Sequence, residues 1–316
     1  MKTPKWRIAV LYGGDSSERE VSLRTGEAVA AALDERGHYV RLIDVRGRSL
    51  DPLDGWDCDL AFIALHGAFG EDGQVQLLLE TRGIPYTGSG VEASRLAMDK
   101  AAAKARFAAA GIPTPECRLL TDKSRAEEVR SAITHIGFPQ VLKPAREGSS
   151  IGITVARTVP EAMAGLAECF RLDNRAIVER FVRGRELTVG ILGRRTLPII
   201  ELVYPGAIFD HHAKYTDGVT RHVINPEFPE KTDELIRTTA LAAHDALGCR
   251  DISRVDIMLP DDHTPFVLEV NSIPGMTATS LVPDAARAAG IEFPELCEAI
   301  ARCAVSQRSR ARREHE

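Results

Sequence analysis

Two acidic residues and an amide have the spacing of a cation site within residues 254–271, RVDIMLPDDHTPFVLEVN. The pattern predicts two short strands joined by a polar Pro/Asp turn, 254–259 and 266–271. Side chains alternate between the faces of a strand, so a symmetric hairpin places Asp256 opposite Glu269 and Arg254 opposite Asn271. Facing carboxylates repel one another, and a hard divalent cation such as Mg²⁺ removes the repulsion and prefers oxygen ligands. An ordinary half-exposed hairpin, with Arg254 as the charge partner of Asp256, fits the same spacing.

A lysine stands beside a loop rich in glycine and serine. Lys143 ends a predicted strand, and residues 144–152, PAREGSSIG, separate it from a second strand at 153–156. Backbone N–H groups of such a loop can close over phosphates, with Lys143 as a fixed positive charge. The Walker pattern GxxxxGK[ST] is absent from this loop, and a flexible surface hairpin is the alternative interpretation.

Residues 204–228 form a long polar segment without periodicity. Segments of this length in compact domains are usually functional lids or disordered, and the aromatic, histidine and lysine content favours a lid. His211 and His212 are adjacent, so they do not both face one metal from a regular element, and a zinc pair is disfavoured. Acids, lysine, loop and lid together indicate a transferase or ligase that handles a metal-bound nucleotide.

The elements that position these groups begin with strands alternating with helices, which predicts a parallel, doubly wound sheet. The predicted strands are 7–12, 39–44, 60–65 and 85–87, and the helices are 17–36, 74–81 and 91–110. Ser17 and Glu20 fit a capping box that opens the first helix. Glu18 and His66 follow strand ends, where ligands of such sheets bind, although position alone favours structural roles for both.

One glycine motif points elsewhere. GSGVEA at residues 88–93 matches the dinucleotide pattern GxGxxA, but the chain continues as helix and lacks an acid about 20 residues on. An oxidoreductase is therefore disfavoured.

Composition bounds the class of protein. The 316 residues are 44% hydrophobic with a net charge of −5, which predicts a globular protein of two or three domains with no nucleic-acid or membrane partner. The six cysteines form no CxxC pair, as expected in a reducing compartment. No signal or membrane-spanning segment is apparent, so we expect a cytoplasmic protein.

Longer motifs resemble the D-alanine–D-alanine ligases of the ATP-grasp superfamily: KPAREGSSIG, SRVDIM, LEVNSIPGMTATSLVP, ALHG, EDG, YTGSG, MDK and AKY. The resemblance runs from about Ile8 to about Ala304. It implies an α/β, three-domain ATP-grasp fold with an N-terminal doubly wound, Rossmann-like parallel sheet. The expected divisions are a first-substrate domain at 1–97, a central subdomain with the Gly/Ser loop at 98–183, a subdomain with lid and metal site at 184–306, and a disordered tail at 307–316.

The resemblance also implies roles at matching positions. The residues expected to hold ATP are Lys100, Lys143, Glu179, Arg180, Phe181, Val182 and Glu186. Two Mg²⁺ or Mn²⁺ ions are expected at Asp256, Glu269 and Asn271, with Glu269 bridging. Glu18 and His66 are expected at the first D-alanine, with Ser149 and Tyr215 linking the loop and the lid to it. Lys214 is expected at the transferred phosphate. Arg254 and Gly275 are expected at the oxyanion, and Ser280 and Leu281 at the second substrate's carboxylate.

The implied reaction forms an acyl phosphate from the first D-alanine, which the amine of the second then captures, with ADP and phosphate released. The family also implies a homodimer and a role in peptidoglycan precursor synthesis. The lid departs from many relatives at His211 and His212, and Ser253 replaces a glycine found in some. Rival interpretations are a ligase using D-lactate, D-serine or another carboxylate and amine pair, and a regulatory nucleotide-binding module. The tyrosine in AKY favours D-alanine, and the intact charged residues disfavour the module.

Overall fold

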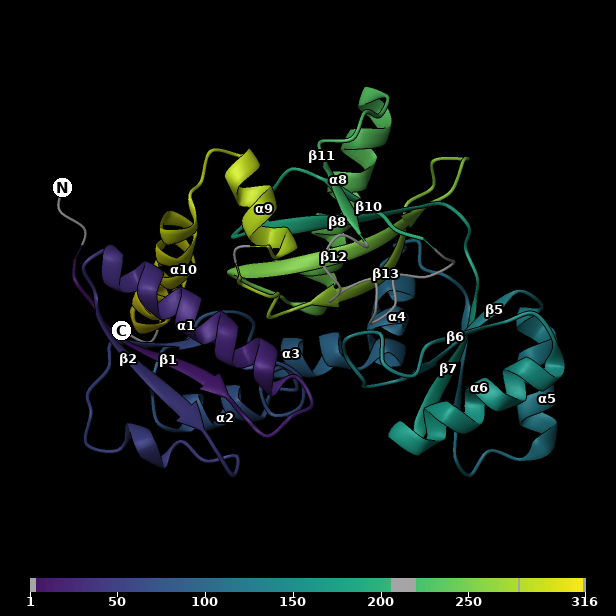
Figure 1. The fold of residues 1–316 in the computed structure, drawn as a ribbon, viewed down its shortest axis with the longest axis horizontal. Helices are drawn as coiled ribbons and strands as arrows, with labels where there is room; N and C mark the ends of the chain where they lie inside the picture. The colour runs from purple at the N-terminus through teal and green to yellow at the C-terminus, as the bar shows by residue number, and fades with distance from the viewer. Residues whose placement is uncertain (1–3, 206–219, 278, 315–316) are drawn as a thin grey trace.

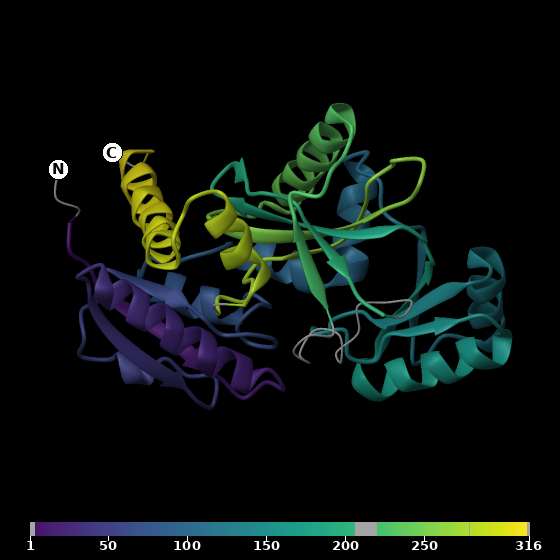
Figure 2. The same ribbon diagram turned by 45° about the horizontal axis from the view of Figure 1, so that its top comes forward.

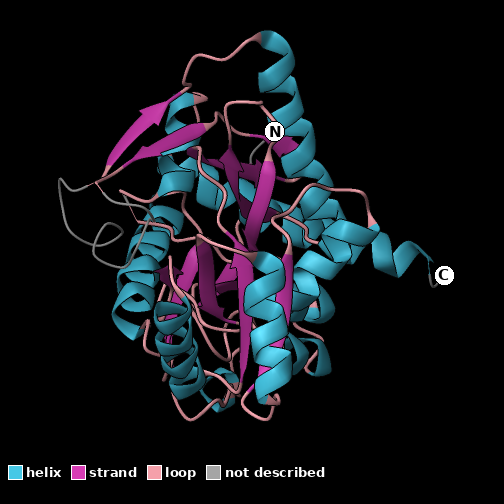
Figure 3. Ribbon diagram, turned by 90° about the vertical axis from the view of Figure 1, so that its right-hand side faces the viewer, coloured by secondary structure: helices cyan, strands magenta, loops and turns pink. Residues whose placement is uncertain are grey.

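The computed structural model describes residues 4–205, 220–277 and 279–314, which form three sheets arranged along the molecule. A small parallel sheet lies at the end that carries both termini, and a four-stranded sheet lies at the opposite end (Figure 1). A larger sheet lies between and above them. Figure 3 shows most of the strands in the interior with helices along the outside, and two strands at the outer edge at the upper left. Within the described part of the chain, every helix is too short or too polar to cross a lipid bilayer.

The N-terminal sheet is parallel, in the order β2-β1-β3, with a further parallel bridge between Ala61 and Tyr86. Its strands are β1 (Arg7–Gly13), β2 (Tyr39–Val45) and β3 (Leu60–Ile63). Ile8 on β1 packs toward α1 (Arg19–Glu35) and α10 (Phe293–Glu314), whereas the next residue, Ala9, packs toward α2 (Gln74–Thr81). The short 3-10 helix η1 (Asp51–Leu53) lies between β2 and β3. The predicted parallel α/β sheet is confirmed.

Two details of the predicted helices were wrong. The capping box of Ser17 and Glu20 does not form: Glu18 is the N-cap of α1 and makes no side-chain cap bond. The predicted helix 91–110 is two helices, α3 (Val91–Met98) and α4 (Lys100–Ala109). Asp99 between them is extended, and its side chain accepts a bond from Ala102 N, so an N-cap acid interrupts the helical periodicity.

The four-stranded sheet is antiparallel, in the order β4-β7-β5-β6, with α5 (Ala126–Ile136) and α6 (Val159–Leu172) packed on one face. Its strands are β4 (Cys117–Thr121), β5 (Gln140–Pro144), β6 (Thr154–Ala156) and β7 (Arg175–Arg180). Both helices lie on the side away from the larger sheet (Figure 2). The opposite face is therefore open toward the larger sheet.

The larger sheet has the order β11-β10-β8-β12-β13, with β9 paired to β8. Its strands are β8 (Arg185–Leu192), β9 (Arg195–Thr196), β10 (Ile200–Val203), β11 (Arg221–Ile224), β12 (Ile252–Leu259) and β13 (Phe266–Asn271). The predicted hairpin register is confirmed, with Arg254 opposite Asn271 and Asp256 opposite Glu269. The register shifts just after Asp256, so Leu268 is an extra residue on β13. Helices α4 and α8 (Glu230–Leu247) bury one face of this sheet.

The C-terminal part returns to the N-terminal sheet through α9 (Leu281–Ala288) and α10, which lies beside α1 (Figure 2). Leu296 and Ile300 of α10 are buried in the cluster that also contains Leu33. Helix α10 continues to Glu314, so the prediction of a disordered tail is wrong for residues 307–314. The alanine, arginine and glutamate of this segment are strong helix formers, which charge counting alone overlooks.

Candidate active site

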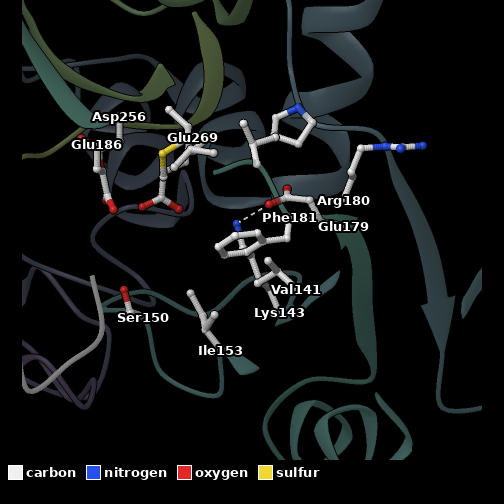
Figure 4. A pocket seen from close by; sticks show the side chains of 14 residues that line it. Val141, Lys143, Ser150, Ile153, Glu179, Arg180, Phe181, Glu186, Asp256 and Glu269 are labelled. Atoms are coloured by element: carbon white, nitrogen blue, oxygen red, sulfur yellow. Dashed lines mark hydrogen bonds and ion pairs between the residues drawn. The ribbon is translucent and has the colours of Figure 1, made fainter. Parts of the chain in front are cut away.

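A cavity lies between the open face of the four-stranded sheet and the larger sheet (Figure 4). Its lining is Pro115, Val141, Lys143, Ser150, Ile153, Glu179, Arg180, Phe181, Val182, Glu186, Asp256, Met258, Leu268 and Glu269. The predicted nucleotide residues other than Lys100 are all in this set. The cavity has two chemically different ends, one mainly apolar and one acidic.

The apolar end is formed by strands from both sheets. Val141 and Lys143 are two residues apart on β5 and so share the face that lines the cavity. Val141 lies opposite Glu179 on β7, which brings this acid to the same wall. Phe181 and Met258 add further apolar surface. Apolar walls with a few fixed polar groups are typical of sites that bind a flat heterocycle.

Two lysines share the buried carboxylate of Glu179. Lys143 Nζ donates to Glu179 Oε1 at 2.6 Å, and Lys104 Nζ lies 2.6 Å from Glu179 Oε2. Burial opposes the charge on Glu179, but the two ammonium groups outweigh it and lower the pKa of this carboxyl. Sequence reasoning missed Lys104. The available signal was its spacing, four residues after Lys100 on one helix.

The acidic end brings together Glu186, Asp256 and Glu269, which Figure 4 shows gathered on one side of the cavity, with the amine of Lys143 between them and Glu179. Arg254 holds Asp256 with two hydrogen bonds, Nε to Oδ1 at 2.9 Å and NH2 to Oδ2 at 2.8 Å. Asn271 Nδ2 also donates to Asp256 Oδ2, at 3.0 Å. Asp256 is therefore held in place, and Arg254 is its charge partner here.

This end fits a hard cation that is bound jointly with phosphate. Asp256, Glu269 and Asn271 offer carboxylate and amide oxygens, the ligands that Mg²⁺ and Mn²⁺ prefer. Among the described residues, no three His, Cys, Asp or Glu side chains converge closely enough to hold a metal without help. Mg²⁺ is usually bound by one or two carboxylates with waters and substrate phosphates completing the shell, so an incomplete protein set is the expected arrangement.

A second group of residues lies at the carboxyl ends of the parallel strands. Ser149, in the loop between β5 and β6, donates to Glu18 Oε1 at the start of α1. His66 is buried, with its Nε2 3.1 Å from Thr25 Oγ1 and its Nδ1 3.5 Å from Glu71 Oε1. Burial raises the pKa of Glu71. Sequence reasoning did not single out this residue, although it is the first of the motif EDG.

Glycines allow the backbone to approach Glu18 closely. A Cβ atom at Gly67 would lie 2.9 Å from Glu18 Oε2, and one at Gly148 would lie 3.0 Å from the same oxygen. Ser149 and Ser150 both have positive φ, of 50° and 57°, which turns the loop toward α1. The structure thus joins Ser149 to Glu18 and places Gly67, the neighbour of His66, beside the same carboxylate.

Lys100 connects the two groups. Its Nζ donates to the carbonyl of Glu147 at 2.6 Å and lies 3.6 Å from Glu269 Oε2. The Gly/Ser loop is therefore held to the acidic end of the cavity by Lys100 and to the N-terminal unit by the bond between Ser149 and Glu18.

The remaining predicted residues have different outcomes. Gly275 neighbours Ser280, whose Oγ lies 3.1 Å from where a Gly275 Cβ would stand, and Ser280 is the N-cap of α9, which begins at Leu281. Backbone N–H groups at such a helix start suit a carboxylate. Arg180 points away from the cavity in Figure 4, and its guanidinium donates to Glu116 at 2.8 Å. The predicted residues that lie outside the described part of the chain are Lys214 and Tyr215, together with His211 and His212.

Comparisons with known proteins identify the family of the chain. A family model described as D-ala D-ala ligase C-terminus matches residues 107–302, and one described as D-ala D-ala ligase N-terminus matches residues 47–89. The chain is 46% identical to a D-alanine--D-alanine ligase of Pelotomaculum thermopropionicum over 95% of its own length and 96% of that protein.

Solved structures are similar over nearly the whole chain. The D-alanine--D-alanine ligase of Bacillus anthracis complexed with ATP has a TM-score of 0.84 at 35% identity, covering 99% of this chain and 100% of that one. The D-Ala:D-Ser ligase VanG of Enterococcus faecalis has a TM-score of 0.83 at 27% identity, covering 94% and 99%. By sequence and by fold, the chain belongs to the D-alanine–D-alanine ligase family.

Proposed function

We propose that the protein joins two molecules of D-alanine at the expense of ATP and releases D-alanyl-D-alanine, ADP and phosphate. The dipeptide then serves peptidoglycan precursor synthesis. The observation that carries this proposal is the continuous set of contacts from Glu18 through the Gly/Ser loop to Lys100 and Glu269. These contacts join an amino-acid site to the acidic end of a nucleotide cavity.

The reaction has two steps. A carboxylate oxygen of the first D-alanine attacks the γ-phosphorus of ATP, and the bond to ADP breaks. The amine of the second D-alanine then attacks the acyl carbon, phosphate leaves, and the amine loses a proton. Bound Mg²⁺ or Mn²⁺ would offset charge on the phosphates, with Asp256, Glu269 and Asn271 as its protein ligands.

Each group of side chains has a distinct task in this scheme. Glu18, steadied by Ser149, holds the ammonium of the first D-alanine next to His66. Lys100 and Lys143 offset phosphate charge beside the cavity. Arg254 and the Gly275 backbone face the charge that develops on the tetrahedral carbon's oxygen.

Three groups exclude water and orient the substrates. Lys214 and Tyr215 are proposed to cover the phosphates and the first amino acid, because water would hydrolyse the acyl phosphate. Ser280 and Leu281 at the start of α9 bind the second carboxylate. Glu179, Arg180, Phe181, Val182 and Glu186 surround the nucleoside, with Arg180 contributing backbone rather than its guanidinium.

We also propose a cytoplasmic homodimer. All six cysteines are free thiols, which suits a reducing compartment. The dimer is taken from the family resemblance and is tested by the molar mass in solution.

One assay tests the proposed function. ADP release is measured with Mg²⁺–ATP and a panel of D-alanine, L-amino acids, D-serine and D-lactate. We expect turnover with D-alanine alone. Absence of that turnover overturns the proposal, and faster turnover with a mixture of D-alanine and D-lactate or D-serine than with D-alanine identifies the alternative ligase.

A further inference from the structure

Lys104 is a buried cation to which the reaction scheme assigns no task. It is 3% exposed, and its Nζ donates to Thr114 Oγ1 at 2.8 Å as well as pairing with Glu179 at 2.6 Å. Thr114 Oγ1 in turn donates to the carbonyl of Val267 at 2.8 Å, so it is fixed as an acceptor toward the lysine. Burial lowers the pKa of Lys104, and Glu179 offsets part of this effect. Burying an ammonium group costs free energy, and an ion pair with a buried carboxylate offsets part of that cost.

The partner, Glu179, stands in the apolar end of the cavity. A carboxyl group with apolar neighbours and no cation tends to take up a proton, and it then becomes a hydrogen-bond donor as well as an acceptor. The titratable groups that face Glu179 are Lys104 from α4, Lys143 from β5 and Cys117, which lies opposite it on β4. Burial raises the pKa of Cys117, so the thiol adds no charge. The lysines therefore decide the protonation state of Glu179.

We propose that Lys104 is a positioning residue for base selection: it fixes Glu179 as an acceptor-only carboxylate at the apolar end of the cavity, which favours a 6-amino purine over a 6-oxo purine. This inference rests on the proposed nucleotide site. An ionised carboxylate accepts from the 6-amino group of adenine but repels the 6-oxo oxygen of hypoxanthine or guanine. Lys143 bonds Glu179 Oε1 and is also assigned to the phosphates. Lys104 pairs with Glu179 Oε2, so its charge serves Glu179 alone.

The first experiment compares Lys104→Met with Phe107→Leu. Phe107 is fully buried on the same helix, so its truncation leaves a cavity without removing a partner of Glu179. For Lys104→Met we expect KM for ATP to rise while kcat at saturation stays within about threefold. The ratio of kcat/KM for ATP to that for inosine triphosphate should fall roughly 10- to 100-fold, as expected for a lost charged hydrogen-bond partner. Phe107→Leu should keep the wild-type ratio.

A second readout separates base selection from a merely structural role. In Lys104→Met the preference for ATP should weaken as pH falls from about 8 to 6, because Glu179 with one cation fewer takes up a proton more readily. The wild-type preference should stay flat over this range. If Lys104→Met does not fold, Glu179→Gln provides the test, because its amide donates as well as accepts and should bring inosine triphosphate closer to ATP.

Binding measurements keep this inference separate from the proposed function. Dissociation constants for ADP and inosine diphosphate, measured without D-alanine, report base selection even if D-alanine is not the substrate. An equal loss of affinity for both nucleotides in Lys104→Met, or a wild-type preference in Glu179→Gln, overturns the inference. Loss of D-alanine turnover with the base preference intact overturns the proposed function alone.

Discussion

At the scale of single residues, the position of Glu18 explains how a carboxylate is oriented at the proposed amino-acid site. It is the N-cap residue of α1, where the helix dipole and unpaired N–H groups favour negative charge. Its Oε1 accepts from Ser149, so its orientation depends on a loop from another part of the fold. A fixed carboxylate at this place matches the ammonium group of an amino acid.

Replacing Glu18 should therefore weaken substrate binding more than turnover. For Glu18→Gln we expect KM for D-alanine to rise roughly 10- to 100-fold, because a charged hydrogen bond becomes a neutral one. Initial rates of ADP release against D-alanine concentration measure the effect. Glu20→Gln is the matched control and should behave as the wild type, because Glu20 is an exposed acid two residues further along, in the first turn of α1. An unchanged KM in Glu18→Gln would remove Glu18 from the amino-acid site.

Glu269 provides the corresponding test of the metal site. Glu269→Gln keeps the shape of the side chain but removes a negative ligand, so turnover should fall by at least about 100-fold while the thermal unfolding midpoint changes little. Asp261→Asn in the exposed turn of the same hairpin is the control. A near-normal rate at saturating Mg²⁺ would show that the metal assignment is wrong.

The site residues that could be predicted from sequence are those placed by the alternation of side chains along a strand. Asp256 and Glu269 face each other because each strand has a period of two, and the extra residue Leu268 between this pair and the turn sets their register. Lys104 was missed because its role depends on a contact with Glu179 on β7, which is distant in the chain. Glu71 was missed because its spacing does not show that it is partly buried beside the nearby His66. Roles at the level of substrate came from the family resemblance rather than from spacing.

At the scale of elements, β4 and the break at Asp99 were not foreseen. The residues of β4 alternate only weakly between apolar and polar, because β4 pairs with β7 at the edge of its sheet and most of its side chains are partly or fully exposed. The break at Asp99 depends on its salt bridge with Arg175 of β7 as well as on the cap. Long periodic helices and the two-strand hairpin were predictable because their patterns are local.

The Gly/Ser loop between β5 and β6 depends on one glycine for its path. Gly152 has φ of +73°, and a Cβ atom there would lie 2.4 Å from Leu172 Cδ1 and 2.9 Å from Pro144 Cγ. Gly152→Ala should displace the loop, raise KM for ATP several-fold and lower the free energy of unfolding by about 1–3 kcal/mol.

ATP titrations and urea unfolding measure both effects of Gly152→Ala. Gly193→Ala is the matched control, since Gly193 also has positive φ, +62°, but no atom within 4 Å of its Cβ position. It should show a stability loss from the backbone alone and an unchanged KM for ATP. Equal behaviour of the two variants would mean that the packing around Gly152 does not position the loop.

At the scale of the whole molecule, contacts distant in sequence join the N-terminal unit to the larger sheet. The backbone N–H of Gly88 donates to Asp251 Oδ2 at 3.1 Å, and Arg250 Nε donates to the carbonyl of Gly88 at 2.9 Å. The glycine motif that resembles a dinucleotide site is thus a structural joint. Sequence alone could not show this contact, because the partners lie 163 residues apart.

A second joint holds α10 against the N-terminal unit through a buried histidine. His38 stacks on Trp6 with ring centroids 5.0 Å apart, and its Nδ1 accepts from Trp6 N. Its Nε2 lies 3.5 Å from Glu298 Oε1 on α10, and Glu298 also accepts from Arg36 NH2 at 2.6 Å. Burial lowers the pKa of His38, and this outweighs the attraction of Glu298. The folded protein therefore favours neutral histidine at this joint.

This joint predicts a loss of stability in acid. The unfolded chain takes up a proton on His38 near pH 6.5, whereas the folded protein does so only at lower pH, so the free energy of unfolding falls as pH drops below about 6.5. The slope for one such group is at most about 1.4 kcal/mol per pH unit. Burial lowers the pKa of His244 as well, so the wild type should lose stability through both histidines.

Urea unfolding between pH 7.5 and 5.5 measures the slope. His38→Gln should be less stable at pH 7.5 but flatter below 6.5, and His263→Gln, in the exposed hairpin turn, should keep the wild-type slope. A wild-type slope in His38→Gln would place the acid sensitivity elsewhere in the molecule.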